Sequence, residues 1–562
     1  MKSTYFFKPL VLTSALAFLL TGCDFLDTKI DTDLTEQSLA TNRELLKNAG
    51  YAMYSPMVSG FYALDDNFFA AASDEAQRTQ ESGNAYIFNR GTLSPDNTSS
   101  VSNIYSQCYE GIRAANFFLD YAKNGEDLLS LNRDIVDDVV QYEKDIRNLN
   151  WFRAEAHIAK AFYYSELIKR FGGVPIVEYM ISNDPDRGKV PRSSYEDVVE
   201  YIVREIDTYK DDLQVDWETH PDEVSKLDGR FELKSALAIK ARTLLYAASP
   251  LNNPSNDKSK WERAAKAAHD VIEEMKYTMP ANRNYGNYFI GGNATNDKES
   301  IFLIRHGAAN DIEKANYPIT TQGGNSGVTP TENLVSAYEY IGNPDPVDPY
   351  KNRDPRLAAT IVYNGSMWNG REIDQSPGGT DDMRIANTSK TGYYLKKFLK
   401  DNLNLVQGGT EVHVWVVYRY AEILLNYAEA MNEAYGPDAR PAGYTLSARE
   451  ALMQVRNSAS MELPPVTTTD PAEFLTALKR ERQVELAFED HRYWDLIRWK
   501  DAENVLNKPV KGVAVVKDEN GVYSYQVVNV AERVFQAKNY LMPFSRSEVI
   551  GSNGTLTQNK DY

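Results

Sequence analysis

The sequence has 562 residues and a formal net charge of −18, with 79 acidic against 61 basic side chains. Nucleic acids and anionic lipid surfaces are bound through basic patches, so this acidity argues against both as partners. With 42% hydrophobic residues the chain can form a large core or several packed subdomains, while only two cysteines, Cys23 and Cys108, argue against a disulfide framework.

The N-terminus has the pattern of a lipoprotein signal. A basic start precedes an apolar run from Leu10 to Leu20, which is too short to cross a bilayer. The junction Leu20-Thr21-Gly22-Cys23 resembles a bacterial lipobox, in which the cysteine sulfur receives a diacylglycerol. We expect residues 1–22 to be removed and Cys23 to carry the lipid at the start of an acidic tether, 23–36. An ordinary secreted protein is the alternative.

Residues 37–279 form the first predicted helical region. Cys108 lies within a helical pattern there, and a lone cysteine of this kind is most often a small buried hydrophobe. Paired stretches with apolar residues at offsets of four and seven follow, and capping boxes at Ser193-Glu196 and Ser259-Glu262 mark two helix starts. This pairing is typical of tetratricopeptide-like repeats with an irregular period. The paired stretches are 150–171 with 193–213, and 237–248 with 259–275.

Residues 280–415 change in texture to glycine, asparagine and proline with two short strand patterns, at 300–306 and 411–418. Loops on a rigid scaffold usually carry the ligand contacts of a protein. We therefore predict an irregular, ligand-facing insert here, and a second irregular region at 73–100.

Residues 416–562 form the predicted C-terminal region. A third helix pair is expected at 417–431 and 446–458, and final helices at about 470–487 and 489–501. Asp470-Pro471 is a good start for the first of these, because aspartate caps a helix and proline fits its first turn. The tail after residue 509 alternates strand-like pieces with turns.

Six segments together are similar to the SusD/RagB family over almost the whole chain. They are CDFLD (23–27), ASDEAQRT (72–79), RAEAHIAKAFYYSELIKRFGGVPIV (153–177), RYAEILLNYAEAMNEA (419–434), ERQVELAFEDHRYWDLIRW (481–499) and YLMPFSRSEVIGSNGTLTQNKDY (540–562). The resemblance implies a mainly α-helical fold, with four tetratricopeptide-like helix pairs packed against an irregular, loop-rich subdomain with short β-strands. It also implies a lipid anchor in the outer membrane, facing the cell exterior.

The same resemblance implies a function in nutrient capture. A cell-surface lipoprotein of this family would bind an oligosaccharide and deliver it to a SusC-like TonB-dependent transporter, over which it closes as a lid. A peptide-binding member of the family is the alternative, and a glycoside hydrolase is a further one. A glycan-binding member and a peptide-binding member would both bind their ligand without turnover. We therefore predict that the chain is not an enzyme.

The hydrolase alternative depends on the acidic cluster Glu481, Glu485, Glu489, Asp490 and Asp495. A hydrolase needs a general acid with a raised pKa and a second carboxylate at a set separation. In this cluster arginines lie three or four residues from the acids, which is the spacing of ion pairs along a helix. Pairing of this kind keeps a carboxylate ionised, so we predict a structural ion network with no catalytic residue.

Two loop regions offer the side chains that a sugar needs, aromatic faces for its C–H side and polar groups for its hydroxyls. No residue can be assigned from the family position by position, so the candidates rest on composition and loop location. From 83–97 they are Asn84, Tyr86, Phe88 and Arg90, and from 310–371 they are Asn310, Tyr317, Trp368 and Arg371.

No cofactor is expected, and the metal content stays open. The six histidines are scattered without paired spacing, and no phosphate-binding glycine loop is present. Loop aspartates offer oxygen ligands suited to a structural calcium ion, but they lack the regular spacing of an EF-hand. They are Asp345, Asp348, Asp354, Asp381 and Asp382.

Overall fold

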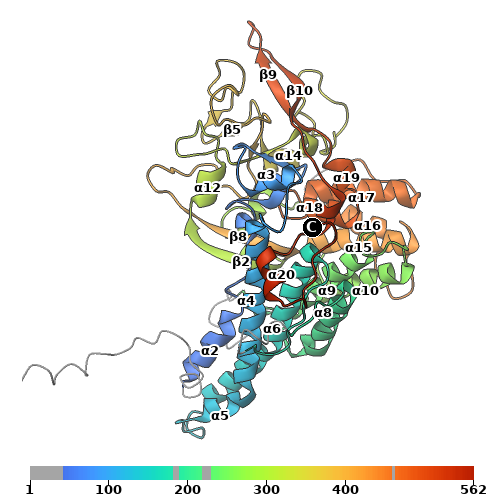
Figure 1. The fold of residues 1–562 in the computed structure, drawn as a ribbon. Helices are drawn as coiled ribbons and strands as arrows, with labels where there is room; N and C mark the ends of the chain where they lie inside the picture. Colours follow the sequence, from blue (N-terminus) through green and yellow to red (C-terminus); the bar gives the residue numbers. More distant parts are fainter. Residues whose placement is uncertain (1–41, 182–188, 218–228, 459–462) are drawn as a thin grey trace, which may run out of the picture.

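The computed structural model describes residues 42–181, 189–217, 229–458 and 463–562. The predicted signal segment and Cys23 lie outside these ranges. The described chain has a layer of long helices and, beside it, an irregular part with short strands (Figure 1). Along the described ranges no helix combines the length and the apolar character needed to cross a membrane. The predicted mainly α-helical fold class is confirmed.

Long helices follow one another as neighbours through the helical layer. Helix α6 packs between α4 and α8, α9 packs against α10, and α15 packs against α10, α16 and α17. The three predicted pairs are therefore neighbours in space. The helices of the layer are α2 (Arg43–Ala52), α4 (Ser99–Tyr121), α5 (Gly125–Ser130), α6 (Val139–Phe171), α8 (Tyr195–Tyr209), α9 (Leu233–Ala248), α10 (Lys258–Met275), α15 (Tyr420–Tyr435), α16 (Ala448–Arg456) and α17 (Pro471–Glu485).

Helix starts show how far local sequence determines this layer. Asp470 caps α17 as predicted, accepting from Ala472 N at 2.8 Å and Glu473 N at 3.0 Å. The capping box of α8 uses Ser194 and Asp197, one residue later than predicted. The box predicted at Ser259 is wrong, because the carboxylate of Asp257 already accepts from Ser259 N at 2.9 Å and starts α10 earlier.

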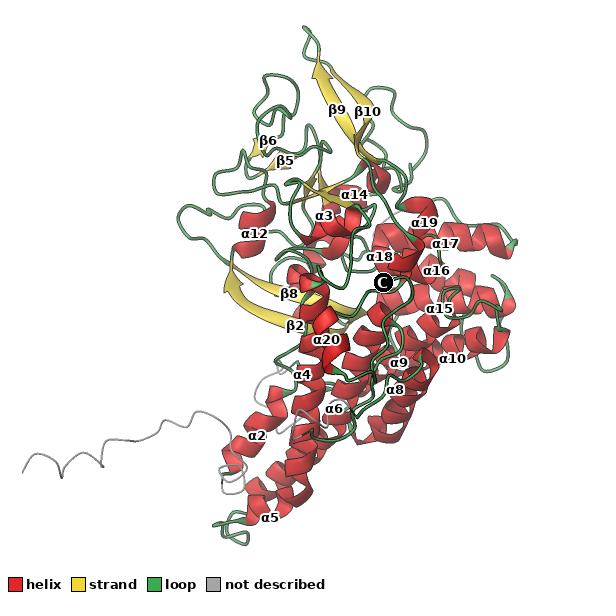
Figure 2. Cartoon of the chain, viewed as in Figure 1, coloured by secondary structure: helices red, strands yellow, loops and turns green. Residues whose placement is uncertain are grey.

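Strands in the described ranges form five two-stranded antiparallel ribbons, drawn as arrows in Figure 2. The ribbon of β2 and β8 confirms both strand patterns expected in 280–415. Because β8 runs to Arg419, it crosses the boundary expected at 415. The strands are β1 (Ala76–Arg78) with β3 (Val328–Pro330), β2 (Ser300–Ala309) with β8 (Glu411–Arg419), β4 (Ile361–Val362) with β7 (Tyr394–Leu395), β5 (Met367–Trp368) with β6 (Arg371–Glu372), and β9 (Val510–Lys517) with β10 (Tyr523–Ala531).

Short helices cover the irregular part and the C-terminal end of the chain. The β9–β10 hairpin projects from the irregular part, whereas the chain ends back beside the helical layer (Figure 1). The short helices are α3 (Asn84–Asn89), α11 (Tyr285–Tyr288), α12 (Asp311–Asn316), α13 (Glu332–Val335), α14 (Arg356–Thr360), α18 (Arg492–Arg498), α19 (Ala502–Val505) and α20 (Arg546–Gly551).

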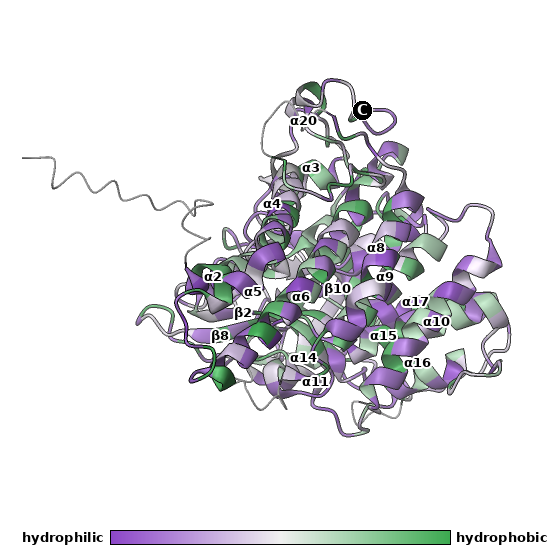
Figure 3. Cartoon of the chain, turned by 90° about the horizontal axis from the view of Figure 1, so that it is seen from below, coloured by the Kyte–Doolittle hydropathy of each residue, from purple (hydrophilic) through white to green (hydrophobic). Residues whose placement is uncertain are grey.

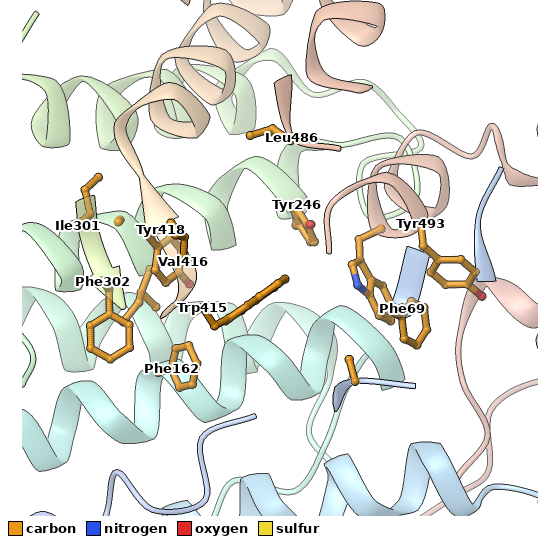
Figure 4. Packing of buried hydrophobic residues seen from close by; sticks show 14 of the residues in the cluster. Phe69, Phe162, Tyr246, Ile301, Phe302, Trp415, Val416, Tyr418, Leu486 and Tyr493 are labelled. Atoms are coloured by element: carbon orange, nitrogen blue, oxygen red, sulfur yellow. The ribbon is translucent and has the colours of Figure 1, made fainter. Parts of the chain in front are cut away.

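Aromatic side chains join the two parts of the fold. Phe302 of β2 packs on Phe162 of α6, with ring centroids 6.2 Å apart, and Trp415 of β8 lies beside them (Figure 4). Cys108 on α4 is buried as predicted. Buried rings of this size account for much of the hydrophobic stabilisation of a core, so the β2–β8 ribbon is fixed firmly on the helices.

Candidate ligand-binding surface

A tight turn at Leu64–Asn67 organises the surface on which most candidate residues lie. The Leu64 and Asn67 backbones exchange hydrogen bonds of 2.9 and 3.0 Å, and Asp65 and Asp66 both have a φ of 54°. Aspartate tolerates this left-handed conformation better than most residues, and two successive positive φ values make the turn compact. The turn therefore holds the Asp65 carboxylate in one direction.

Asp65 anchors the short helix α3. Its carboxylate accepts from Asn84 N at 2.7 Å and Ala85 N at 2.8 Å, and it pairs with Arg78 at 2.5 Å. The first N–H groups of a helix have no partner within the helix, so a carboxylate at this position stabilises the start of α3. Gly83 enters the helix with a φ of 86°, a conformation that favours glycine. The anchor fixes α3 relative to the turn.

Helix α3 corrects the expectation that 83–97 is a loop. The candidate residues on it differ in how far they are buried. Phe88 is buried and packs on Phe69, with centroids 5.3 Å apart, so it is a core residue and not a ligand contact. The Asn84 amide donates to Asp65 at 2.9 Å. Tyr86 is half-buried and Arg90 is exposed, with the guanidinium carbon 4.1 Å from the ring centroid. Only this cation–π pair presents ligand-binding chemistry at the surface of α3.

The segment from Asn310 to Gly327 lies on the other side of the turn. Asn67 and Asn316 exchange amide hydrogen bonds of 3.0 and 3.1 Å, and Gln80 donates to Asn325 O at 3.2 Å. The two predicted loop regions are thus brought together around Leu64–Asn67. Asn310 is half-buried, and its amide donates to Gly409 O at 2.7 Å.

Tyr62, beside the turn, is an exposed aromatic residue that sequence analysis did not select. The residue is 37% exposed, and its ring contacts His306, with centroids 5.6 Å apart. Partial burial and a hydrogen bond to the neighbouring Asp311 carboxylate raise the pKa of Tyr62, so the hydroxyl stays protonated. The signal was present in the sequence, because the run Asp65-Asp66-Asn67 is typical of a turn.

Tyr317 and Trp368 do not belong to the surface, and both predictions are corrected. They are 0% and 1% exposed and pack edge to face, with ring centroids 5.0 Å apart. The Tyr317 hydroxyl donates to the Lys400 carbonyl. Loop aromatics can fill a core of their own when a long insert folds back on itself, which composition alone does not distinguish from a ligand platform.

Arg371 joins the insert to the same segment. Its guanidinium donates to both Asp381 oxygens, at 2.5 and 2.8 Å, and to Thr320 Oγ1 at 2.9 Å. Burial alone would raise the pKa of Asp381, but hydrogen bonds and the Arg371 charge outweigh it, and the pKa lies below its ordinary value. Arg371 therefore fixes the loop at Thr320, and about a third of its side chain stays exposed.

The acidic cluster at 481–495 forms a buried ion network, as predicted, although mostly not with neighbours along the helix. Glu485 accepts from Arg283 at 2.6 Å, Arg356 at 2.7 Å and Arg419 at 2.7 Å. Burial would raise the pKa of Glu485, but these three charges hold it well below its ordinary value. An ionised carboxylate cannot serve as the general acid that a glycosidase requires.

Two other members of the cluster differ from each other. Asp495 accepts from Arg482 at 2.9 Å and Arg498 at 2.8 Å, and these arginines lower its pKa against the effect of burial. Burial dominates at Asp490 and raises its pKa, although Lys169 partly offsets that effect. Asp490 is half-buried and accepts from Trp494 Nε1 at 3.1 Å, so it too has a partner within the fold.

The loop aspartates considered as calcium ligands are each engaged by cations or backbone N–H groups. Asp345 pairs with Lys351 at 2.9 Å, which together with backbone N–H groups lowers its pKa to about 2, and Asp354 pairs with Arg356 at 2.8 Å. Asp382 pairs with Arg384. No cluster of three or more metal-ligating side chains occurs in the described part of the chain.

Two hollows lie beyond the turn. One, of about 740 Å³, is lined by asparagines and two lysines from the α11, α14 and 396–402 segments. The other is a groove of about 460 Å³ between α4, the 175–181 segment and α20. In Figure 3, α3, α4 and α20 lie together on the side of the molecule away from α11 and α14. Helix α3 and the helices that line this groove therefore belong to one side of the protein.

Fold and surface together define a helical scaffold protein that presents aromatic and polar side chains on short anchored segments. Comparison with known proteins identifies the family. The model of the SusD family matches residues 274–562, and a model described as starch-binding, associating with outer membrane, matches residues 24–245. The chain belongs to the SusD family.

Relatives and solved structures agree with this assignment. SusD-like protein P2 of Formosa agariphila is 22% identical over 86% of this chain and 84% of its own length. A SusD-like protein of Bacteroides fragilis has a TM-score of 0.75 at 23% identity, covering 94% of this chain and 99% of its own. A SusD-like carbohydrate-binding protein of the same species has a TM-score of 0.73 at 25% identity, covering 92% and 99%.

Proposed function

We propose that this protein is a glycan-binding lipoprotein of the outer membrane that captures oligosaccharide at the α3 surface. By this name we mean the exposed side chains of Tyr62, Arg90 and Asn325 and the half-buried side chains of Gln80 and Tyr86. The observation that carries the proposal is the pair of half-buried Tyr86 and exposed Arg90 on a helix fixed by Asp65. A ring and a guanidinium held in place lose little conformational freedom when a sugar binds.

Chemistry and family both support a saccharide as ligand. Tyrosine rings pack on the apolar face of a pyranose, while Gln80 and Asn325 offer amide donors and acceptors for hydroxyls. A solved family relative is described as a carbohydrate-binding protein, and one matching family description refers to starch binding. Moderate affinity suffices if the protein covers a transporter mouth, because tethering raises the local ligand concentration.

The first experiment is a carbohydrate-array screen of the purified protein, with release of reducing sugar assayed on every hit. We expect binding without release. Tyr86→Ala should weaken binding by roughly 1–3 kcal/mol, the usual cost of losing a central aromatic contact. Tyr86→Phe is the matched control, since it keeps the ring and should keep most of the affinity. Sugar release would support the hydrolase alternative, and silence on all glycans with binding of peptides would contradict the proposal.

We further propose that the protein is anchored through a lipid on Cys23, faces the cell exterior and works with a SusC-like TonB-dependent transporter. The lipobox pattern and the family description of outer-membrane association support this. Cys23→Ala should abolish metabolic labelling with fatty acid and release the protein from membranes. Digestion of intact cells with protease tests the orientation, and co-purification of a large barrel protein with the tagged chain tests the partnership. Wild-type labelling in the Cys23→Ala variant would overturn the anchor.

A further inference from the structure

The groove along α4 is built from three segments that are far apart in the sequence. One wall is a face of α4 that carries Tyr105, Tyr109 and Asn116, and the second is the extended segment 175–181. The third wall is the chain end from Glu548 to Leu556. None of the candidate residues selected from the sequence lies here. The groove is a separate feature from the α3 surface, and the helices α4 and α20 that line it lie on the same side of the molecule as α3 (Figure 3).

Side chains of α4 and α6 fix the second wall. The Tyr109 hydroxyl donates to Pro175 O at 2.7 Å, and the Asn116 amide donates to Val177 O at 3.0 Å. From α6, the Tyr164 hydroxyl accepts from Val177 N at 2.6 Å. The extended segment is therefore held at a set distance from α4, and the groove between them is preformed.

Arg192 fixes the third wall in the same way. Its backbone N donates to Thr555 O at 3.0 Å, and its guanidinium donates to Thr557 O at 2.8 Å and to Asn559 Oδ1 at 2.6 Å. The same guanidinium donates to Gly173 O at 2.7 Å, next to the extended segment. One arginine thus ties the second and third walls together, and a ligand would enter a site that needs little rearrangement.

Tyrosine rings give the groove an aromatic lining. Tyr105 and Tyr109 are in contact, with centroids 4.8 Å apart, and Tyr179 on the opposite wall is 57% exposed. Covering this exposed ring with the apolar face of a ligand would be favourable, because it removes apolar surface from water. Its amphipathic character suits a ligand with one apolar face and a hydroxylated rim.

Three polar side chains of α4 at the groove have no partner among the described residues. The side chains of Ser106, Glu110 and Arg113 are exposed on α4, and none of the three forms a hydrogen bond or ion pair with another described residue. Asn116 is 3% exposed, yet its Oδ1 has no hydrogen-bond partner among the described residues. A carboxylate and a guanidinium one helical turn apart supply acceptors and donors for adjacent hydroxyl groups.

We infer that this groove is a second saccharide-binding site, which takes one or two pyranose units against Tyr179 and Tyr109 and holds their hydroxyls with Glu110 and Arg113. The inference rests on the proposed function as a glycan-binding protein and adds a site to it. Its position beside the α3 surface allows two parts of one branched or folded glycan, or two separate chains, to be held on the same side of the protein.

The test is equilibrium binding of a disaccharide panel (maltose, cellobiose, lactose, mannobiose and xylobiose) to the purified full chain in detergent. Tyr179→Ala and Glu110→Gln should each weaken the binding of at least one disaccharide by about 10-fold or more, the effect of losing a main contact. Gln107→Ala is the matched control, because Gln107 is exposed on α4 and does not line the groove. Hydroxyl-radical footprinting should show Tyr179 protected by the disaccharide that binds.

The α3 variant separates the two proposals. If Tyr179→Ala weakens the binding of a disaccharide and Tyr86→Ala leaves the binding of the same disaccharide unchanged, the groove is a separate site. If Tyr86→Ala abolishes all binding and Tyr179→Ala changes nothing, the groove inference fails and the α3 surface stands. If no disaccharide or longer glycan binds the wild type, both proposals fail. All substituted residues are exposed or half-buried, so the circular dichroism spectrum should match the wild type in each variant.

Discussion

Glu485 and Glu110 are glutamates on two helices of the same layer, α17 and α4, but their surroundings are opposite. Glu485 is fully buried and accepts from three arginines, whereas Glu110 is exposed at the groove and has no described partner. The same side chain therefore fixes the fold in one place and is available to a ligand in the other. Engagement by partners, more than residue type, distinguishes structural from ligand-binding charges in this protein.

The largest expected effect is the loss of the Glu485 charge. Glu485→Gln leaves Arg283, Arg356 and Arg419 buried with one carboxylate fewer, and breaking a buried ion pair typically costs about 3–5 kcal/mol. Chemical denaturation should show that loss in the free energy of unfolding. Glu110→Gln, the matched exposed change, should stay within about 0.5 kcal/mol of wild type. Equal stability of the two variants would contradict the contrast between a structural glutamate at 485 and a free one at 110.

A second contrast concerns the two tyrosines predicted from loops. Tyr317→Ala should lower the free energy of unfolding by about 3 kcal/mol, because it removes a fully buried ring packed on Trp368. Tyr86→Ala should leave stability nearly unchanged and act on ligand affinity instead. Thermal unfolding followed by circular dichroism distinguishes the two. A stable Tyr317→Ala protein with weakened glycan binding would restore Tyr317 as a ligand contact.

Acid should weaken the buried network through its carboxylates. The pKa values of Glu485 and Asp495 are lowered in the folded protein, so their stabilisation is complete above the unfolded carboxyl pKa of about 4. It is lost as the pH falls toward the folded values, by up to about 1.4 kcal/mol per pH unit for each group. The free energy of unfolding measured from pH 6 to pH 3 should fall, and Glu485→Gln should show a shallower slope. An identical slope in both proteins would exclude Glu485 as a contributor.

The smallest effect is expected at the anchor of α3. Asp65→Ala removes the acceptor for Asn84 N and Ala85 N, and loss of a helix cap costs about 1 kcal/mol. Hydrogen exchange should become faster at residues 84–90 and unchanged in α17. Weaker glycan binding should accompany the local change, since Tyr86 and Arg90 lose their fixed position. Unchanged exchange at α3 would show that Asp65 does not hold it.

Local sequence patterns predict the helices and strands of this protein better than its ligand-facing surface. Helix α17 starts at Asp470 as expected, and the strands at 300–306 and 411–418 are present, because caps and periodicity are read from neighbouring residues. Within 83–97 the same reasoning missed α3, which is only six residues long and is capped by Asp65, 19 residues earlier. Tyr317, Trp368 and Phe88 were chosen for their type, and burial removed all three from the surface.

The sequence by itself determined the helical layer, the family and the acidic character of the chain, since periodicity, motifs and net charge are local or additive properties. Tertiary structure alone decided which charges are paired. The three arginines around Glu485 lie 202, 129 and 66 residues before it, and no spacing rule predicts such contacts. Tertiary structure likewise decided which tyrosines face solvent, because burial depends on segments that meet only in the folded chain. Examples are α4, 175–181 and the C-terminal end at the groove.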